Sequence, residues 1–289
     1  MFITDKRLYK DLAAIGDDIM ASNAPIGVFD SGIGGTTVVK ELMASLPNEK
    51  IIYYGDTARV PYGNKSKETI ITYSRQIANF LMEKKVKAIV IACNTASAVA
   101  LETLRHELPV PIIGVVKPGA KAAAEATKNN KIGVIATRAT VNSGIYEEFL
   151  HKTDPKIHVY KQACPLFVPL VEEGWIDDDV TRSIIHRYLD GLLKKNIDAL
   201  ILGCTHYPLL ADEIGKITGE KVKLVNPAFE CAREFRYVLE ENDLLCEEEN
   251  PHENEFYVSD DPNSFAGFAN SILGEDSVKT GNVFIKNFD

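Results

Sequence analysis

Short apolar runs alternate along the chain with segments whose apolar residues recur at helical spacing. The runs that begin at Ile26 are rich in β-branched residues and too short for helices, so they predict strands. We expect strands at 26–29, 51–54, 88–92, 112–115, 132–136, 157–160, 199–202, 222–225 and 256–258. We expect helices near 35–46, 67–84, 96–107, 140–152, 179–195, 208–217 and 232–241. This alternation predicts an α/β fold whose mainly parallel sheets are covered by helices on both faces.

Two of the helical segments carry specific expectations. In segment 179–195 one apolar face is expected to contain Val180, Ile184, Tyr188, Leu189 and Leu192. In the first 24 residues, a short amphipathic helix is expected from the spacing of Leu8, Leu12, Ile15 and Ile19. We therefore treat 1–24 as an N-terminal helical extension, which either packs on the body of the protein or binds a partner.

The two halves of the pattern resemble each other. I-G-V-F-D-S at 26–31 matches I-G-V-I-A-T at 132–137, an offset of 106 residues. A-I-V-I-A-C-N-T at 88–95 matches A-L-I-L-G-C-T-H at 199–206, an offset of 111 residues. Because both matches occur in the same order at nearly equal offsets, we interpret the chain as one α/β unit used twice. The interpretation predicts two pseudo-symmetric doubly wound domains.

Composition narrows the classes of function. A chain of 289 residues suggests about two domains at roughly 150 residues each. Its 41 acidic residues outnumber its 32 basic residues, and a net charge of −9 argues against a nucleic-acid binder. No apolar run approaches the ~20 residues of a membrane helix, and the chain does not start with the apolar segment of a signal peptide. We expect a cytoplasmic protein with no membrane or nucleic-acid partner.

The cysteines are of two kinds. There are five and no C-x-x-C, which fits neither a disulfide framework nor a zinc module. Cys93 and Cys204 end the matched strands, at the edge where open α/β sheets bind ligands. The start of the following helix is expected to lower the pKa of each thiol and favour the thiolate. Cys164, Cys231 and Cys246 lack this context, and we expect them to be structural.

Polar residues follow both of these thiols. Asn94 and Thr95 follow Cys93, and Thr205 and His206 follow Cys204. Their side chains and backbone N–H groups suit a substrate carboxylate. His206 is also a candidate for proton handling, as is Glu172 unless it is an ordinary surface acid. No metal is expected, because the spacing around Cys204 and His206 matches no standard zinc pattern.

Two further motifs are candidates for substrate contacts. D-S-G-I-G-G at 30–35 follows a strand but matches neither G-x-G-x-x-G nor a P-loop, so it does not indicate a nucleotide site. Asp30 either bonds an ammonium group or assists a thiol, or else only caps the next helix. In P-Y-G at 61–63, Tyr62 and Gly63 either contact a carboxylate or form only a turn.

Two matched thiols suit one kind of reaction. Removing a proton from one face of a carbon and returning a proton to the other face requires a base and an acid on opposite sides. A thiolate and a thiol from two related domains provide that pair, with the substrate between the domains. A hydrolase with one nucleophilic cysteine does not need the second thiol.

The chain closely resembles the glutamate racemases of the cofactor-independent aspartate/glutamate racemase group. The resemblance rests on G-V-F-D-S-G-I-G-G, Y-Y-G-D-T-A-R-V-P-Y-G, A-C-N-T-A-S, C-P-L-F-V-P-L-V-E and G-C-T-H-Y-P-L-L, from 26 to about 210. It implies interconversion of L- and D-glutamate without a cofactor, which supplies D-glutamate for peptidoglycan, by a homodimeric enzyme. It also implies a first domain at 25–118 plus 231–289 and a second at 119–230.

The resemblance assigns roles by position. Cys93 resembles the thiol that acts on the D-isomer and Cys204 the thiol that acts on the L-isomer. Asp30, His206 and Glu172 resemble the assisting groups. The implied substrate contacts are Asp30, Ser31, Tyr62, Gly63, Asn94, Thr95, Thr205 and His206.

Three alternatives remain open. The first is a racemase for aspartate or another amino acid. The second is a cysteine-nucleophile hydrolase or acyl transferase, for which a covalent intermediate is expected. The third is a binding or regulatory protein that acts through 1–24, with no turnover.

Overall fold

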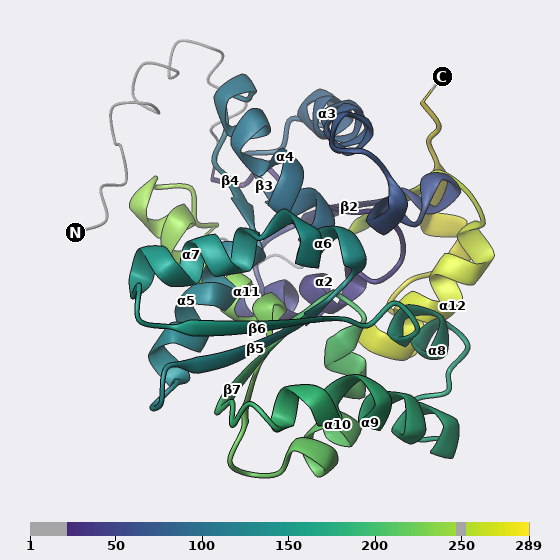
Figure 1. The fold of residues 1–289 in the computed structure, drawn as a ribbon. Helices are drawn as coiled ribbons and strands as arrows, with labels where there is room; N and C mark the ends of the chain where they lie inside the picture. Colours follow the sequence, from purple (N-terminus) through teal and green to yellow (C-terminus); the bar gives the residue numbers. More distant parts are fainter. Residues whose placement is uncertain (1–21, 247–252, 289) are drawn as a thin grey trace.

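The computed structural model describes residues 22–246 and 253–288, which form two parallel β-sheets with helices on both faces of each (Figure 1). The helix expected from Leu8 to Ile19 lies outside the described residues. Within them, no helix is long and apolar enough to cross a membrane.

The first sheet has six parallel strands in the order β10-β9-β2-β1-β3-β4. Their bounds are β1 Ile26–Asp30, β2 Ile51–Gly55, β3 Ala88–Ile91, β4 Ile112–Gly114, β9 Glu255–Val258 and β10 Val283–Ile285. One face is covered by α2 (Thr36–Ser45), α11 (Pro227–Glu241) and α12 (Pro262–Leu273). The other is covered by α3 (Lys67–Glu83) and α4 (Asn94–Glu107).

The second sheet has four parallel strands in the order β6-β5-β7-β8. Their bounds are β5 Lys131–Ala136, β6 His158–Ala163, β7 Ala199–Gly203 and β8 Lys223–Val225. One face packs on α5 (Val116–Ala126) and α7 (Ile145–Thr153). The other packs on α8 (Phe167–Glu172), α9 (Asp179–Leu193) and α10 (Ala211–Thr218). The short α6 (Arg138–Ser143) follows β5.

The strand order repeats between the two sheets. β2-β1-β3-β4 of the first sheet corresponds to β6-β5-β7-β8 of the second. The register repeats as well, because Ile26 lies opposite Ala88 and Ile132 lies opposite Ala199. These four residues begin the matched sequence segments, so the structure agrees with one unit used twice. The predicted α/β fold with parallel sheets is confirmed.

Two helices carry the chain between the sheets. α5 lies between β4 of the first sheet and β5 of the second, and α11 follows β8 of the second sheet. The expected domain boundaries at 118 and 231 fall inside these helices, and they stay a prediction. Because α5 and α11 also pack on each other, the two crossings lie side by side.

Several elements differ from the expectations. The helix expected at 140–152 is interrupted at Gly144, whose φ of +70° ends α6 before α7 begins. The face predicted for α9 is wrong at Val180, which is 49% exposed, because the buried face consists of Thr181, Ile185, Leu189 and Leu192. Val180 lies one residue, or about 100° around the helix, from that face.

Three described α-helices and one described strand were not expected at all: α5, α8, α12 and β10. α5 contains Pro118-Gly119, a pair that usually marks a turn. Proline is tolerated there because it lies in the first helical turn, where the backbone N–H has no partner within the helix.

A buried ion pair joins the amino-terminal ends of two strands in the first sheet. Lys87 Nζ lies 2.6 Å from Glu49 Oε2, and their side chains are 0% and 2% exposed. Glu49 also accepts a hydrogen bond from the N–H of Cys246 at 2.9 Å, and Lys87 donates to the carbonyl of Ser22. The pair therefore fastens two peripheral segments of the chain to the sheet.

We expect Lys87→Met to lower the free energy of unfolding by about 3–5 kcal/mol, because it leaves a buried carboxylate without its cation. Urea unfolding followed by circular dichroism measures this change. The matched control is Arg105→Met, which breaks an exposed ion pair with Glu102 and should cost less than about 1 kcal/mol. Equal costs for the two variants would contradict the expectation.

Candidate active site

The two matched thiols lie at the carboxyl ends of β3 and β7, as predicted. Cys93 caps the amino end of α4: its Sγ accepts the N–H of Ala96 at 3.4 Å and donates to Ser31 Oγ at 3.4 Å. Cys204 directly follows β7, but a 3-10 turn at Tyr207–Leu210 precedes α10. Only Cys93 is therefore placed at the start of an α-helix.

The electrostatic environment of Cys93 differs from the sequence expectation. Burial, and next the charge of Asp30, raise the pKa of this thiol to about 12. Hydrogen bonds with Ser31 and Ala96 act in the opposite direction but are outweighed. The expected thiolate is wrong for Cys93 in this structure, where the side chain is a buried thiol. A charge on Cys204 also raises the Cys93 pKa, so the two sulfurs lie within electrostatic range.

Asp30 lies at the end of β1 and is 1% exposed. Its Oδ2 accepts the N–H groups of Gly32 at 3.2 Å and Gly35 at 3.1 Å, which holds the glycine-rich turn. Its Oδ1 is buried and has no hydrogen-bond partner among the described residues. Burial raises the Asp30 pKa, while the charge of His206 and the backbone N–H groups oppose the shift. Besides closing the turn, Asp30 therefore has one acceptor left over.

His206 bridges Cys204 and Glu172. Its Nδ1 lies 3.9 Å from Cys204 Sγ, and its Nε2 lies 2.9 Å from Glu172 Oε1. Burial lowers the pKa of His206, but its hydrogen bonds to Cys204 and Glu172 together outweigh burial and raise the pKa to about 10. His206 is thus an imidazolium at neutral pH. Glu172 comes from the end of α8 and is exposed, but its carboxylate pairs with this ring, so it is not an isolated surface acid.

Threonine side chains join the two halves of the molecule beside the thiols. Thr37 Oγ1 of α2 donates to the carbonyl of Thr205 at 2.9 Å. On the opposite side, Thr95 Oγ1 lies 3.0 Å from Thr137 Oγ1 and 3.2 Å from Thr140 Oγ1. Each thiol is therefore followed by a residue that contacts the other half.

The contacts between the two halves differ because matched positions carry different residues on the two sides. Gly34 and Thr140 are separated by 106 residues, the offset of the matched strands. Thr140 contacts Thr95, whereas a Cβ on Gly34 would lie 2.4 Å from His206 Cε1. His206 therefore fits on its side of the site only because position 34 has no side chain.

The P-Y-G segment forms a short 3-10 turn, Tyr62–Asn64, that reaches the second half. A Cβ on Gly63 would lie 3.4 Å from Thr137 Cβ, in ordinary contact. The Tyr62 side chain is buried and its hydroxyl donates to the carboxylate of Asp56. The predicted substrate contact is therefore left to the backbone N–H groups of Tyr62 and Gly63, since the hydroxyl is already engaged.

The site contains residues that sequence reasoning missed. Thr137 occupies the position that matches Ser31 in the repeat, so aligning the two halves identifies it. Tyr146 donates its hydroxyl to Asn94 Oδ1 at 2.6 Å, and no motif signals this contact. Thr37 is also outside the quoted motifs.

The other three cysteines are buried and unpaired. Cys164 directly follows β6, which corrects the expectation that it lacks a strand-end position; β6 ends at Ala163 rather than at Tyr160. Burial raises the pKa of Cys164 and of Cys231. Their structural role stays a prediction. In the described ranges, no three His, Cys, Asp or Glu side chains gather as metal ligands.

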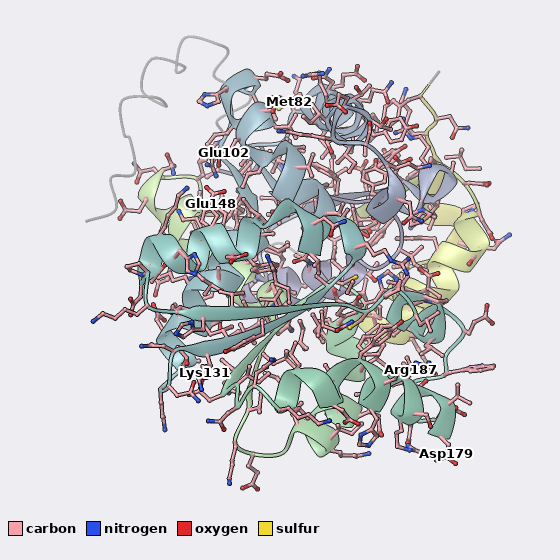
Figure 2. The ribbon with its side chains drawn as sticks, viewed as in Figure 1. Met82, Glu102, Lys131, Glu148, Asp179 and Arg187 are labelled. Carbon is pink, nitrogen blue, oxygen red and sulfur yellow. The ribbon has the colours of Figure 1, made fainter. Side chains whose placement is uncertain are left out.

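Both thiols are buried inside the molecule, whereas charged side chains lie on its surface. Cys93 is 5% exposed and Cys204 is 7% exposed. Charged side chains such as Glu148 of α7 and Asp179 of α9 lie instead at the outside of the molecule (Figure 2). In this structure the two thiols are thus largely shielded from solvent.

Comparison with known proteins finds one family and many relatives. The sequence model of the Asp/Glu/Hydantoin racemase family matches residues 29–234. A glutamate racemase of Geobacter metallireducens is 48% identical over 259 residues, which cover 90% of this chain and 95% of the relative. A glutamate racemase of Neisseria meningitidis is 52% identical over 251 residues, covering 86% and 93%. The structure resembles a crystal structure of Francisella tularensis glutamate racemase in complex with D-glutamate, with a TM-score of 0.84, 43% identity and coverage of 92% and 98%.

We expect His206 to remain protonated well above the ordinary histidine range. Imidazole NMR of the six histidines should show the His206 resonance, identified by its loss in His206→Asn, titrating near pH 10. Since the folded pKa exceeds the ordinary value of 6.5, the stability from this ion pair is complete below pH 6.5 and is lost as the pH rises toward 10.

Glu172→Gln should lower the pKa of His206, because it removes the negatively charged carboxylate that lies beside Nε2. Glu173→Gln changes the neighbouring acid and is the matched control. A wild-type His206 that titrates near pH 6.5, or one that does not respond to Glu172→Gln, would contradict the ion pair.

Proposed function

The chain belongs to the Asp/Glu/Hydantoin racemase family, and on this premise we propose that it interconverts L- and D-glutamate by proton transfer between two thiols. The observation that carries the proposal is the pair Cys93 and Cys204, which end matched strands of a duplicated unit and lie within electrostatic range of each other. The relatives named as glutamate racemases, which match about nine-tenths of the chain, favour glutamate as the substrate.

Each thiol acts on one face of the substrate α-carbon. With L-glutamate, the Cys204 thiolate removes the α-proton and the Cys93 thiol donates a proton to the opposite face. With D-glutamate the roles reverse. Each turnover leaves Cys204 as the thiol and Cys93 as the thiolate, or the reverse, so protons must redistribute before the next cycle. His206 lies against Cys204 Sγ, where it assists proton movement at this sulfur, and Asp30 supports proton movement at Cys93.

The barrier lies in the carbanionic transition state, because the α-proton of an amino acid is weakly acidic. We propose that no cofactor takes part and that preorganised donors and exclusion of water supply the stabilisation. The burial of both thiols supports a reaction screened from solvent. Under this proposal the unpaired Oδ1 of Asp30 receives the substrate ammonium group.

The substrate carboxylates are assigned to donors that surround the thiols. Ser31 Oγ lies beside Cys93, and the amide of Asn94 has its oxygen already engaged. The remaining proposed contacts are Thr95, Thr205, His206 and the backbone N–H groups of Tyr62 and Gly63. These groups give an anionic substrate local donors in a protein whose net charge is −9.

The wider setting is also proposed. D-glutamate made by this chain would enter peptidoglycan, and five free thiols fit a reducing cytoplasm. A homodimer is proposed from the family resemblance, and light scattering after gel filtration measures it. Aspartate remains the alternative substrate, and a panel of amino acids tests the preference.

We expect the D-glutamate formed from L-glutamate in D2O to carry deuterium at the α-carbon, because the incoming proton comes from a thiol that exchanges with solvent. Cys93→Ala and Cys204→Ala should each abolish racemisation, to less than about a thousandth of the wild-type rate. NMR follows the exchange and chiral chromatography follows the product.

Cys246→Ala is the matched control, since it removes a buried thiol far along the chain from both strand ends and should retain activity. Full activity after loss of either Cys93 or Cys204 would overturn the two-thiol mechanism. A trapped covalent adduct on one cysteine, without α-exchange, would point to a hydrolase or acyl transferase.

A further inference from the structure

Tyr146 lies between the two thiol-bearing segments. It belongs to α7 in the second half and is 2% exposed. Its ring packs on Gly203, the residue before Cys204, where a Cβ would lie 3.2 Å from Tyr146 Cε2. Its hydroxyl donates to Oδ1 of Asn94, the residue after Cys93, at 2.6 Å. One side chain therefore contacts the immediate neighbours of both thiols.

This hydrogen bond determines which end of the Asn94 amide is available. A carboxamide has one acceptor oxygen and one donor nitrogen, and rotation by about 180° exchanges them. Burial raises the pKa of Tyr146, and the nearby charge of Cys204 raises it further, so the hydroxyl stays protonated and donates. With Oδ1 engaged by this donor, Nδ2 is left to donate to a ligand.

We propose that Tyr146 is a positioning residue for glutamate racemisation: from the second half it orients the Asn94 amide so that Nδ2 donates to a substrate carboxylate. The inference rests on the proposed function and adds a residue to it. It makes the carboxylate contact beside Cys93 depend on the half of the molecule that carries Cys204.

Removing the hydroxyl has a defined expected effect. In Tyr146→Phe the ring still packs on Gly203, but Asn94 Oδ1 loses its buried donor and the amide is free to rotate. Loss of one such bond should lower kcat/KM for glutamate by about tenfold. Because the contact is made in the bound ground state, most of the loss should appear as a higher KM rather than as a lower kcat.

A double-mutant cycle separates positioning from mere support of the fold. Tyr146→Phe, Asn94→Ala and the double variant are compared by kcat/KM with L-glutamate. If Tyr146 acts through Asn94, its loss costs about tenfold in the wild type and less than twofold in the Asn94→Ala background. Equal losses in both backgrounds, or no loss in either, overturn the inference.

The matched control is Tyr257→Phe, which removes a hydroxyl that donates to Glu255 in β9, outside the site. It should leave kcat and KM within twofold of the wild type. If Tyr146→Phe does not fold, Asn94→Asp tests the same point, since a carboxylate still accepts from Tyr146 but presents no donor. Asn94→Asp should raise KM about tenfold or more, and an unchanged KM overturns the inference.

The wild-type assay keeps the two proposals apart. A wild-type protein that does not racemise glutamate overturns the proposed function. A wild-type protein that does racemise glutamate, with kinetics insensitive to Tyr146→Phe, overturns only the role of Tyr146.

Discussion

Burial of ionisable groups is the constraint on which the site depends, because a side chain removed from water keeps its charge only beside a compensating partner. Cys93 has a carboxylate nearby, and its pKa rises to about 12. Cys204 has an imidazolium nearby, whose own pKa rises to about 10 through Cys204 and Glu172. Two chemically identical thiols are thereby given opposite electrostatic surroundings. The proposed proton transfer therefore takes place between two sulfurs in unlike electrostatic environments.

The duplicated fold brings these groups together. Cys93 follows β3, which pairs with β1, and Cys204 follows β7, which pairs with β5. The two strand pairs have the same register. The carboxyl ends of parallel strands lie at one edge, so each unit contributes one thiol there. The two sides of the site differ because matched positions carry different residues. Asp30 in one copy corresponds to Ala136 in the other.

Much of this arrangement is readable from the sequence. Strand runs, the repeat and the two thiols all follow from local patterns, and the structure places them as expected. The thiolate state predicted for Cys93 was wrong because burial and the charge of Asp30, both tertiary properties, outweigh the helix terminus. Tyr146 was missed for a similar reason: its contact with Asn94 spans 52 residues and joins the two halves. Val180 was assigned to the buried face of α9 because spacing alone does not fix the rotation of a helix about its axis. The elements that α9 packs against fix that rotation.

The missing side chain at position 34 ties that position to the residues that follow the thiol of the other copy. An imidazole at 206 and a side chain at 34 compete for the same space, since a Cβ would lie 2.4 Å from the ring. The Thr205 side chain occupies the same space, because that Cβ would also lie 2.5 Å from Thr205 Oγ1. A side chain at 34 would therefore require changes at both 205 and 206, and a single change at 206 would not make room for it. A position without a side chain in one copy thus constrains two consecutive positions in the other.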